Sequence, residues 1–279
     1  MSGSHQPPPP PPAAPAAAAP RDAGANDAGG FAVRAVATLR TPFAEKFGVP
    51  RQSGLIEEAE ARVEFAPEFA RADFVRGLEA FSHVWLVTWF HQSPAWKGAA
   101  TVRPPRLGGN DRVGVFASRS PNRPNPIGLS LVRLLSIETE PTLILRVAGI
   151  DAVDGTPVLD VKPYLPWCEA LPDARADWAG GAPQVRDANA VLIAPELAAR
   201  FLRGPATTDL DSPVGRDGNN TEAGARTLAL IRHLLQLDLQ PAYQREEGRE
   251  YGMTIAGWNI RWRALSGGRV EVIDATRAG

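Results

Sequence analysis

The sequence predicts a mainly β protein, with an antiparallel sheet or barrel followed by a smaller α+β domain. Three observations lead to this fold class. Many short segments are rich in β-branched and aromatic residues or alternate between apolar and polar residues. Turns that contain glycine or proline separate these segments. Few helical patterns lie between them, which argues against a series of β-α-β units.

The composition sets broad limits on the protein. The 279 residues are enough for one large or two ordinary domains, and 44% of them are hydrophobic, which allows a sizeable core. A net charge of −1 provides no overall field for nucleic acid, although arginine far outnumbers lysine and leaves room for local basic patches. The single cysteine, Cys168, excludes an internal disulfide framework and a thiolate zinc cluster. No apolar run reaches membrane-spanning length and no signal peptide is evident, so we expect a soluble cytoplasmic protein.

The first thirty residues are rich in proline, alanine and glycine, with an unbroken proline run from Pro7 to Pro12. Such a composition cannot bury enough apolar surface to offset the entropy of ordering the chain. We therefore predict that residues 1–30 form a disordered, polyproline-like tail. A ligand for a proline-recognition domain is the alternative.

The sequence pattern then changes to short β-type segments. We predict strands over residues 31–39, 56–65, 81–90, 112–117, 129–137, 142–150 and 157–161. The segment 81–90 is continuously apolar, which is typical of a strand that is buried on both faces. Residues 69–78 form a short helical or irregular segment.

A connector over residues 164–183 leads into the second domain. Residues 190–203 begin as a strand and continue as a helix, with Pro195 in the first turn. We predict a long, polar, mobile loop over residues 204–220, followed by a helix over 221–237 with Thr221 as its cap. Strands are expected over 251–256, 258–265 and 269–275, the last two joined as a hairpin by Ser266-Gly267-Gly268.

Loop 118–130 is the stretch most suited to binding. Pro121, Pro124, Pro126 and a glycine restrict its backbone, and arginines, asparagines and serines lie between them. A stiff loop with guanidinium and amide donors suits a polar, partly anionic ligand. The alternative is a proline-rich connector between two strands.

Other common chemistries have no candidate in the sequence. There is no Gly-x-Ser-x-Gly elbow, no Walker loop and no Gly-x-Gly-x-x-Gly turn, and the four histidines lack the spacing of a metal site. Polar clusters do occur at strand ends, namely at residues 50–52, 91–92, 119–125 and 151–157. Asp160, Lys162 and Tyr164 add an acid, an amine and a phenol, for which structural salt bridging is an equal alternative.

Several long motifs occur in an order that resembles the TrmO family, the TsaA-like tRNA methyltransferases. They are residues 45–52, 77–83, 103–110, 118–130, 154–157 and 160–166, with 241–243 and 258–262 in the second domain. The resemblance implies a single-sheet β-barrel catalytic domain that binds S-adenosylmethionine, and a homodimer. It also implies methylation of N6 of the threonylcarbamoyl-adenosine beside the tRNA anticodon. The corresponding domain boundaries are 1–30 for the tail, 31–168 for the barrel, 169–189 for a linker and 190–279 for the α+β domain.

The resemblance also assigns site residues. Cofactor contacts fall on Pro50, Arg51, Gln52, His91, Gln92, Arg119, Leu129, Asp151, Ala152, Val153 and Asp154. Asp160, Lys162 and Tyr164 are candidates for assisting proton removal, and Arg123, Tyr243 and Arg261 for contacting tRNA. No metal is expected.

The chain departs from the family pattern at Gln240 and Gln244, where arginine-like residues are expected, and in the inserted segment 204–220. Because both departures lie in the second domain, they bear on tRNA binding and selectivity more than on cofactor binding. Two alternatives therefore stay open: a methyltransferase with another RNA or small-molecule substrate, and a non-catalytic module that binds S-adenosylmethionine.

Overall fold

The computed structural model describes residues 31–107, 111–181, 183, 185–203, 220–237 and 246–278. The chain divides into two compact units, residues 1–34 and residues 35–279. All helices and strands named below belong to the second unit. The predicted tail, most of the predicted loop 204–220 and the motif around Tyr243 lie outside the described residues.

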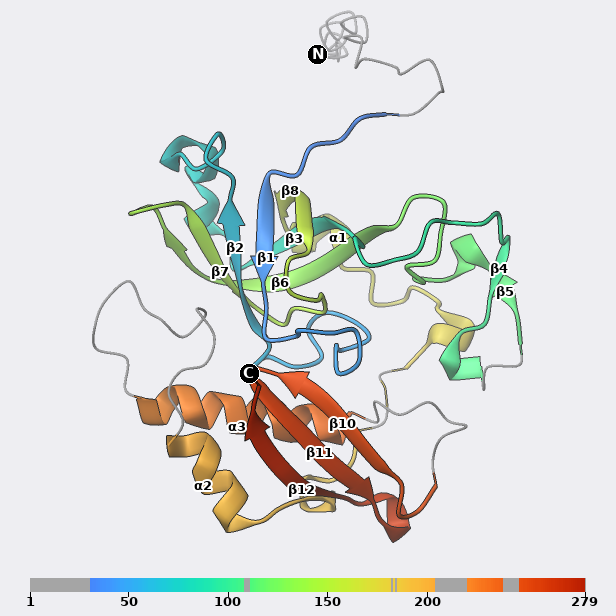
Figure 1. The fold of residues 1–279 in the computed structure, drawn as a ribbon. Coiled ribbons are helices and arrows are strands. Elements are labelled where there is room, and N and C mark those ends of the chain that lie inside the picture. The colour runs from blue at the N-terminus through green and yellow to red at the C-terminus, as the bar shows by residue number, and fades with distance from the viewer. Residues whose placement is uncertain are drawn as a thin grey trace, which may run out of the picture. The chain divides into compact units, whose positions relative to one another are not determined.

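Six antiparallel strands close into a barrel, which confirms the predicted fold class (Figure 1). Around the barrel the strand order is β1-β2-β7-β6-β3-β8. The strands are β1 (Ala37–Arg40), β2 (Glu60–Phe65), β3 (His83–Trp89), β6 (Ile127–Glu138), β7 (Ile144–Ala148) and β8 (Pro157–Pro163). Antiparallel pairing suits the short connections in this part of the sequence, because neighbouring strands can be joined without crossover helices.

Alternation along the strands builds the core of the barrel. Side chains alternate between the two faces of each strand, and the inner positions include fully buried apolar residues such as Leu39, Val63, Leu86 and Val158. The prediction that segment 81–90 is buried on both faces is wrong. In β3 the residues alternate between buried and half-buried, because a strand of a closed barrel has one inner and one outer face.

Smaller elements fill the connections of the barrel. Short 3-10 turns at Ala72–Val75 and Leu78–Ala80 occupy the segment predicted to be helical or irregular. Only Val113–Gly114 of the strand predicted over 112–117 form a strand, β5, which pairs with β4 (Thr101–Val102). Val115–Ala117 form a 3-10 turn instead. After the barrel, α1 (Pro166–Glu169) begins the connector.

The C-terminal part is a four-stranded sheet with two helices, as predicted. Its strand order is β10 (Glu250–Ile255), β11 (Trp258–Ala264), β12 (Val270–Arg277) and β9 (Val191–Ile193), and β9 runs parallel to β12. Helix α2 (Pro195–Arg203) begins at the proline that was expected in its first turn. Helix α3 (Asn220–Gln236) begins one residue before the predicted cap Thr221, and its buried leucines and Ile231 join the core.

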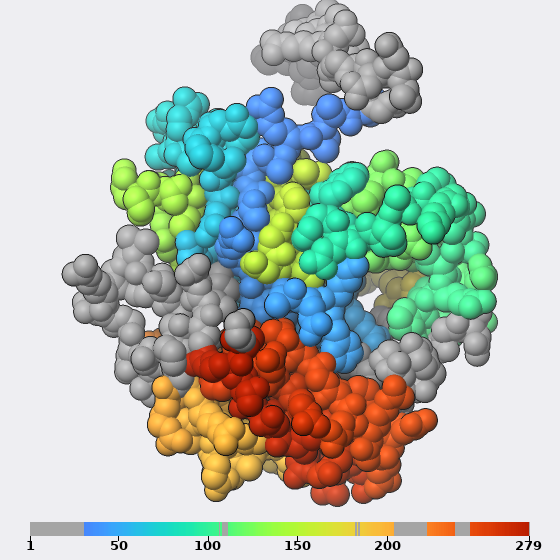
Figure 2. Space-filling view, in the orientation of Figure 1, coloured from blue at the N-terminus to red at the C-terminus, as the bar shows by residue number. Residues whose placement is uncertain are grey.

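The segment between β1 and β2 contacts the C-terminal sheet. Phe43 forms an isolated antiparallel bridge with Ile255 of β10, and the backbone N–H of Ala256 donates to the carbonyl of Pro42 at 2.8 Å. Figure 2 shows this blue segment directly against the red C-terminal strands. The buried residues of the barrel and of the C-terminal part form one continuous hydrophobic cluster. Within the described residues, every helix is too short or too polar to cross a bilayer.

Candidate functional site

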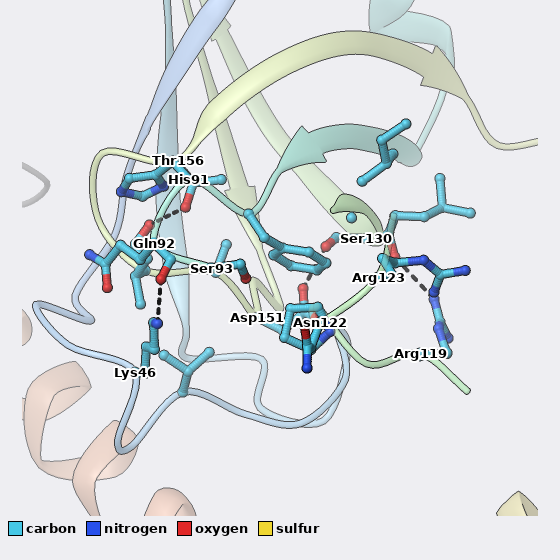
Figure 3. A pocket seen from close by; sticks show the side chains of 18 of the residues that line it. Lys46, His91, Gln92, Ser93, Arg119, Asn122, Arg123, Ser130, Asp151 and Thr156 are labelled. Carbon is cyan, nitrogen blue, oxygen red and sulfur yellow. Dashed lines mark hydrogen bonds between the residues drawn. The ribbon is translucent and has the colours of Figure 1, made fainter. Parts of the chain in front are cut away.

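A cavity of about 720 Å³ opens at one end of the barrel. It lies where β1 and β3 end, where β6 begins and where β7 turns into β8, so four separate segments surround it (Figure 3). The lining comes from residues 46–52, 90–94, 116–130 and 151–156. Each of the polar clusters that the sequence places at strand ends, at 50–52, 91–92, 119–125 and 151–157, contributes to it.

The first wall of the cavity is loop 118–130, and contacts within the loop fix its shape. The guanidinium of Arg123 donates to the carbonyl of Ser118 at 3.2 Å, and the N–H of Asn122 donates to the hydroxyl of Ser120 at 3.2 Å. Arg119 donates to the carbonyl of Leu129 at 3.1 Å. Together with three prolines, these bonds hold two guanidinium groups at the cavity with little freedom to reorder.

The second wall is segment 46–52, which connects to the segment after β3. The ammonium group of Lys46 donates to the carbonyl of Gln92 at 2.5 Å. This bond joins two walls that are 46 residues apart in the chain. Val49, Pro50, Arg51 and Gln52 then continue the lining.

The lining of the cavity includes a half-buried acid, Asp151. The hydroxyl of Ser130 donates to a carboxylate oxygen of Asp151 at 2.5 Å. Burial raises the pKa of Asp151, while the hydrogen bond from Ser130 and the nearby charge of Arg119 act in the opposite direction. Asp151 is the one carboxylate among the lining residues, which also include Lys46, Arg51, Arg119 and Arg123, so the cavity is basic around a single acid.

Ten of the eleven predicted cofactor residues line this cavity: Pro50, Arg51, Gln52, His91, Gln92, Arg119, Leu129, Asp151, Ala152 and Val153. The eleventh, Asp154, lies outside the lining. Its carboxylate accepts from the N–H of Thr41 at 2.9 Å and lies 3.7 Å from the guanidinium of Arg40, so it holds the turn in place. The cofactor role of all eleven stays a prediction.

The three predicted catalytic residues lie on or just after β8 and outside the lining of this cavity. Lys162 pairs with Asp160 at 3.0 Å, and the ring of Tyr164 packs edge-on against His83 and Trp85. Asp160 borders a second cavity of about 610 Å³, whose lining is mostly apolar and includes Phe65, Phe69, Phe74 and Phe81. Their catalytic role is untested by this geometry and stays a prediction.

The predicted tRNA contacts are dispersed. Arg123 lines the first cavity, whereas Arg261 lies on β11 and is hydrogen-bonded to Glu250. Tyr243 lies outside the described residues. Among the described residues, no group of three or more histidine, cysteine or acidic side chains has the arrangement of a metal site.

Sequence reasoning did not single out several residues of the site. Lys46 lies within a motif that the sequence analysis used, yet its contact with Gln92 depends on tertiary structure. Ser130 looks like an ordinary strand residue, and only its position opposite the 151–156 turn reveals its role. Phe90 and Phe116, which supply aromatic surface to the lining, read as strand residues.

The arrangement suits a ligand of mixed character. Guanidinium groups can hold a carboxylate or phosphate, and a carboxylate can accept from hydroxyl or ammonium groups. Val49, Phe90 and Leu129 offer apolar surface for a planar ring system. A nucleoside that carries a charged chain combines these features.

Two family models match the chain. The tRNA-methyltransferase O N-terminal domain matches residues 38–170, which contain the barrel, and the TrmO C-terminal domain matches residues 216–278. The first match alone includes all four segments that surround the cavity.

Individual relatives agree with these matches. The chain is 42% identical over 242 residues to tRNA (adenine(37)-N6)-methyltransferase of Escherichia coli, covering 85% of this chain and 95% of that protein. It is 39% identical over 145 residues to a protein of Pyrococcus abyssi whose name describes S-adenosyl-L-methionine binding, covering 52% of this chain and 74% of the relative. A crystal structure of TrmO from Pseudomonas aeruginosa superposes with a TM-score of 0.68 at 32% identity, covering 89% of this chain and 98% of that one.

Proposed function

The chain belongs to the TrmO family, and from this we propose that it methylates N6 of adenosine 37 in tRNA with S-adenosylmethionine as the methyl donor. One structural observation carries the proposal. The polar clusters that are far apart in the sequence meet around one basic cavity at the end of the barrel. The finer proposal is that the target adenosine already carries the threonylcarbamoyl group.

The residues of the cavity fit the cofactor. Its volume of about 720 Å³ is within the range of roughly 300–1,000 Å³ that is usual for small-molecule sites. Arg119 would hold the carboxylate of the methionine part, and Asp151 would accept from a ribose hydroxyl or the ammonium group. Leu129 and Val49 would contact the adenine ring. When bound, the cofactor supplies a methyl group that its sulfonium charge has already activated.

The protein therefore acts mainly by positioning. A C–N bond forms at N6, the C–S bond of the donor breaks, and N6 gives up a proton. Holding both reactants in line can contribute on the order of 7–11 kcal/mol to the rate. The rigid loop 118–130 is suited to this role because its prolines and internal hydrogen bonds resist rearrangement.

There are two alternative assignments for the residue that accepts the proton released by N6. Asp160, Lys162 and Tyr164 are candidates from their side-chain chemistry, but they lie outside the lining of the cavity. Asp151 lies within it, and burial raises the pKa of its carboxyl group, which makes the carboxylate a better proton acceptor. We favour Asp151 for this step.

The remaining assignments follow from the same proposal. Arg123 at the cavity contacts the anticodon-loop phosphates, because guanidinium groups bind phosphate well. Arg261 and Tyr243 contact tRNA from the C-terminal domain. We also propose a cytoplasmic homodimer, as the family resemblance implies.

Methyl transfer from labelled S-adenosylmethionine tests the function. Two preparations of one tRNA are needed, with and without the threonylcarbamoyl group on adenosine 37, and the product nucleosides are identified by mass spectrometry. We expect one added methyl at N6 of the modified nucleoside and none in the unmodified tRNA. Equal labelling of both preparations contradicts the finer proposal, and labelling of neither contradicts the tRNA substrate.

A further inference from the structure

Residues 42–52, here called the shared loop, contact two parts of the protein at once. Pro42, Phe43, Glu45 and Phe47 contact the C-terminal sheet, whereas Lys46 and residues 49–52 line the cavity. The same short segment is therefore both a wall of the binding site and the main described contact of the barrel with β10 and β11.

The contacts on the sheet side are specific. A carboxylate oxygen of Glu45 accepts from the N–H of Thr254 at 2.9 Å. The ring of Phe47 stacks on Trp262 with 5.9 Å between ring centroids and 6° between ring planes, and Trp262 stacks in turn on Tyr251. The shared loop is therefore held against the sheet by a hydrogen bond and by aromatic stacking.

Gly48 shows how closely the loop approaches the sheet. Its φ of +98° is a conformation that side-chain residues rarely adopt, and a Cβ there would lie 3.2 Å from the sulfur of Met253 on β10. The chain reverses at this glycine and enters the cavity wall at Val49. The backbone of the wall is thus placed directly by the surface of β10.

The loop has few supports of its own on the cavity side. Among the described contacts, Lys46 donates to the carbonyl of Gln92, the N–H of Val49 donates to the carbonyl of Lys46 at 3.4 Å, and the amide of Gln52 donates to the neighbouring carbonyl of Arg51. Loop 118–130, in contrast, is held by three prolines and by hydrogen bonds among its own residues. The position of the shared loop therefore depends more on the C-terminal sheet.

We propose that the C-terminal sheet is a positioning element of the cofactor site, with Phe47 and Glu45 as the positioning residues. They act through the shared loop and touch no substrate. For the identity of the ligand, this inference rests on the proposed function. It assigns to the C-terminal domain a part in cofactor affinity in addition to any contact with tRNA.

Phe47→Leu tests the inference, with Phe201→Leu as the matched control. Phe201 is a buried phenylalanine of α2 whose ring packs edge-on against Trp258, with 4.8 Å between ring centroids, whereas Phe47 stacks on Trp262. Both changes weaken the core of the C-terminal domain, but only the first touches the loop. Hydrogen exchange of the cofactor-free protein gives the first readout, and calorimetric titration with S-adenosylmethionine gives the second.

We expect Phe47→Leu to speed exchange in residues 46–52 and leave residues 119–130 unchanged. The dissociation constant for S-adenosylmethionine should rise at least about fivefold, a change of roughly 1 kcal/mol. Phe201→Leu should leave both readouts within twofold of the wild type. Equal effects of the two variants on exchange in residues 46–52, or on affinity, overturn the inference.

A second pair of variants examines the polar contact. Glu45→Ala removes the acceptor for the N–H of Thr254, and Glu45→Gln keeps an acceptor oxygen in the same place. Exchange in residues 46–52 should rise in the first variant and return toward wild type in the second. Equal exchange in both overturns the role of Glu45. If the wild type does not bind S-adenosylmethionine, the proposed function fails, while the exchange measurements still decide the positioning role.

Discussion

The two walls of the cavity are held in place in different ways. Loop 118–130 is fixed by its own prolines and by bonds such as Arg123 to Ser118, all within thirteen residues of sequence. The shared loop is fixed by residues more than 200 positions away, such as Thr254. One wall is therefore a local property of the sequence, and the other is a property of the whole fold.

This difference predicts how the site responds to change. Substitutions in the first wall should act on ligand contacts directly, with little effect elsewhere. Substitutions at the sheet side of the second wall should alter binding from outside the cavity. The predictions that follow test each side of the comparison, beginning with the largest expected effect.

Replacement of Arg119 by alanine should weaken binding of S-adenosylmethionine most. The guanidinium is the charged donor of the first wall, and a hydrogen bond to a charged group contributes about 1.5–3 kcal/mol, or roughly 10- to 100-fold in affinity. Titration calorimetry measures the change. Arg269→Ala, at an exposed arginine beside the β11–β12 turn, is the control and should bind like the wild type. Unchanged affinity for S-adenosylmethionine in Arg119→Ala would contradict the assignment of loop 118–130 to the cofactor site.

Replacement of Gly128 by alanine should destabilise the protein by about 1–3 kcal/mol, the usual cost of overpacking a core. An added Cβ would clash with the hydroxyl of Thr88 and lie 2.9 Å from the ring of Phe90. Urea unfolding measures the loss. Gly155→Ala is the comparison, because it introduces backbone strain without crowding. Gly155 has a positive φ of 75°, but the space around its Cβ position is open. A Gly128→Ala protein as stable as the wild type would contradict the tight packing at this end of the barrel.

Replacement of Asp151 by asparagine should lower methyl transfer without lowering the stability of the protein. At saturating S-adenosylmethionine, which offsets a loss of cofactor contacts, methyl transfer should still fall strongly, whereas Lys162→Ala, outside the cavity, should retain most of it if Asp151 accepts the proton. Comparable losses of methyl transfer in the two variants would contradict Asp151 as the proton acceptor and favour Asp160, Lys162 or Tyr164.

The same variant gives a pH test. Because burial raises the pKa of Asp151 in the folded protein, its contribution to stability is largest below the unfolded pKa and is lost as the pH rises through the folded value. Asp151→Asn should therefore be more stable than the wild type at pH 7, and this advantage should shrink as the pH falls toward 4. Urea midpoints at both pH values measure it, and an advantage that grows on acidification would contradict the burial of the charge.

Replacement of Pro124 by alanine should have the smallest effect. Loss of a proline costs about 0.4–1 kcal/mol through the entropy of the unfolded chain, and the internal hydrogen bonds of the loop remain. We expect cofactor affinity to fall by less than about fivefold. A larger loss, with stability unchanged, would show that the prolines, rather than the hydrogen bonds, set the geometry of the first wall.

The comparison also explains what the sequence could predict. Period-two patterns and turn residues locate β1, β2, β6, β7 and β8 and the C-terminal hairpin, because these signals are local. They also locate β3, but its continuous apolar run conceals that its outer face is only half-buried. They are right only in part at residues 112–117, where a 3-10 turn replaces the second half of the predicted strand.

The site shows the same division. Its polar clusters are visible in the sequence because they follow strand ends, but their meeting at one cavity depends on barrel closure. The contact of Lys46 with Gln92, and the support of Phe47 by Trp262, have no sequence signal, since each joins residues far apart in the chain. The position of Asp160 beside a different cavity from Arg119 likewise depends on which side of β8 faces outward.

The most direct test of the account is hydrogen exchange of the wild-type protein with and without saturating S-adenosylmethionine. The two cavities are lined by different segments, so the segments whose exchange slows on binding show which cavity holds the ligand. We predict slower exchange in residues 46–52, 90–94, 119–130 and 151–156, and unchanged exchange in residues 69–81 beside the second cavity. Protection confined to residues 69–81, or none in the four segments of the first cavity, would contradict the assignment of this cavity as the cofactor site.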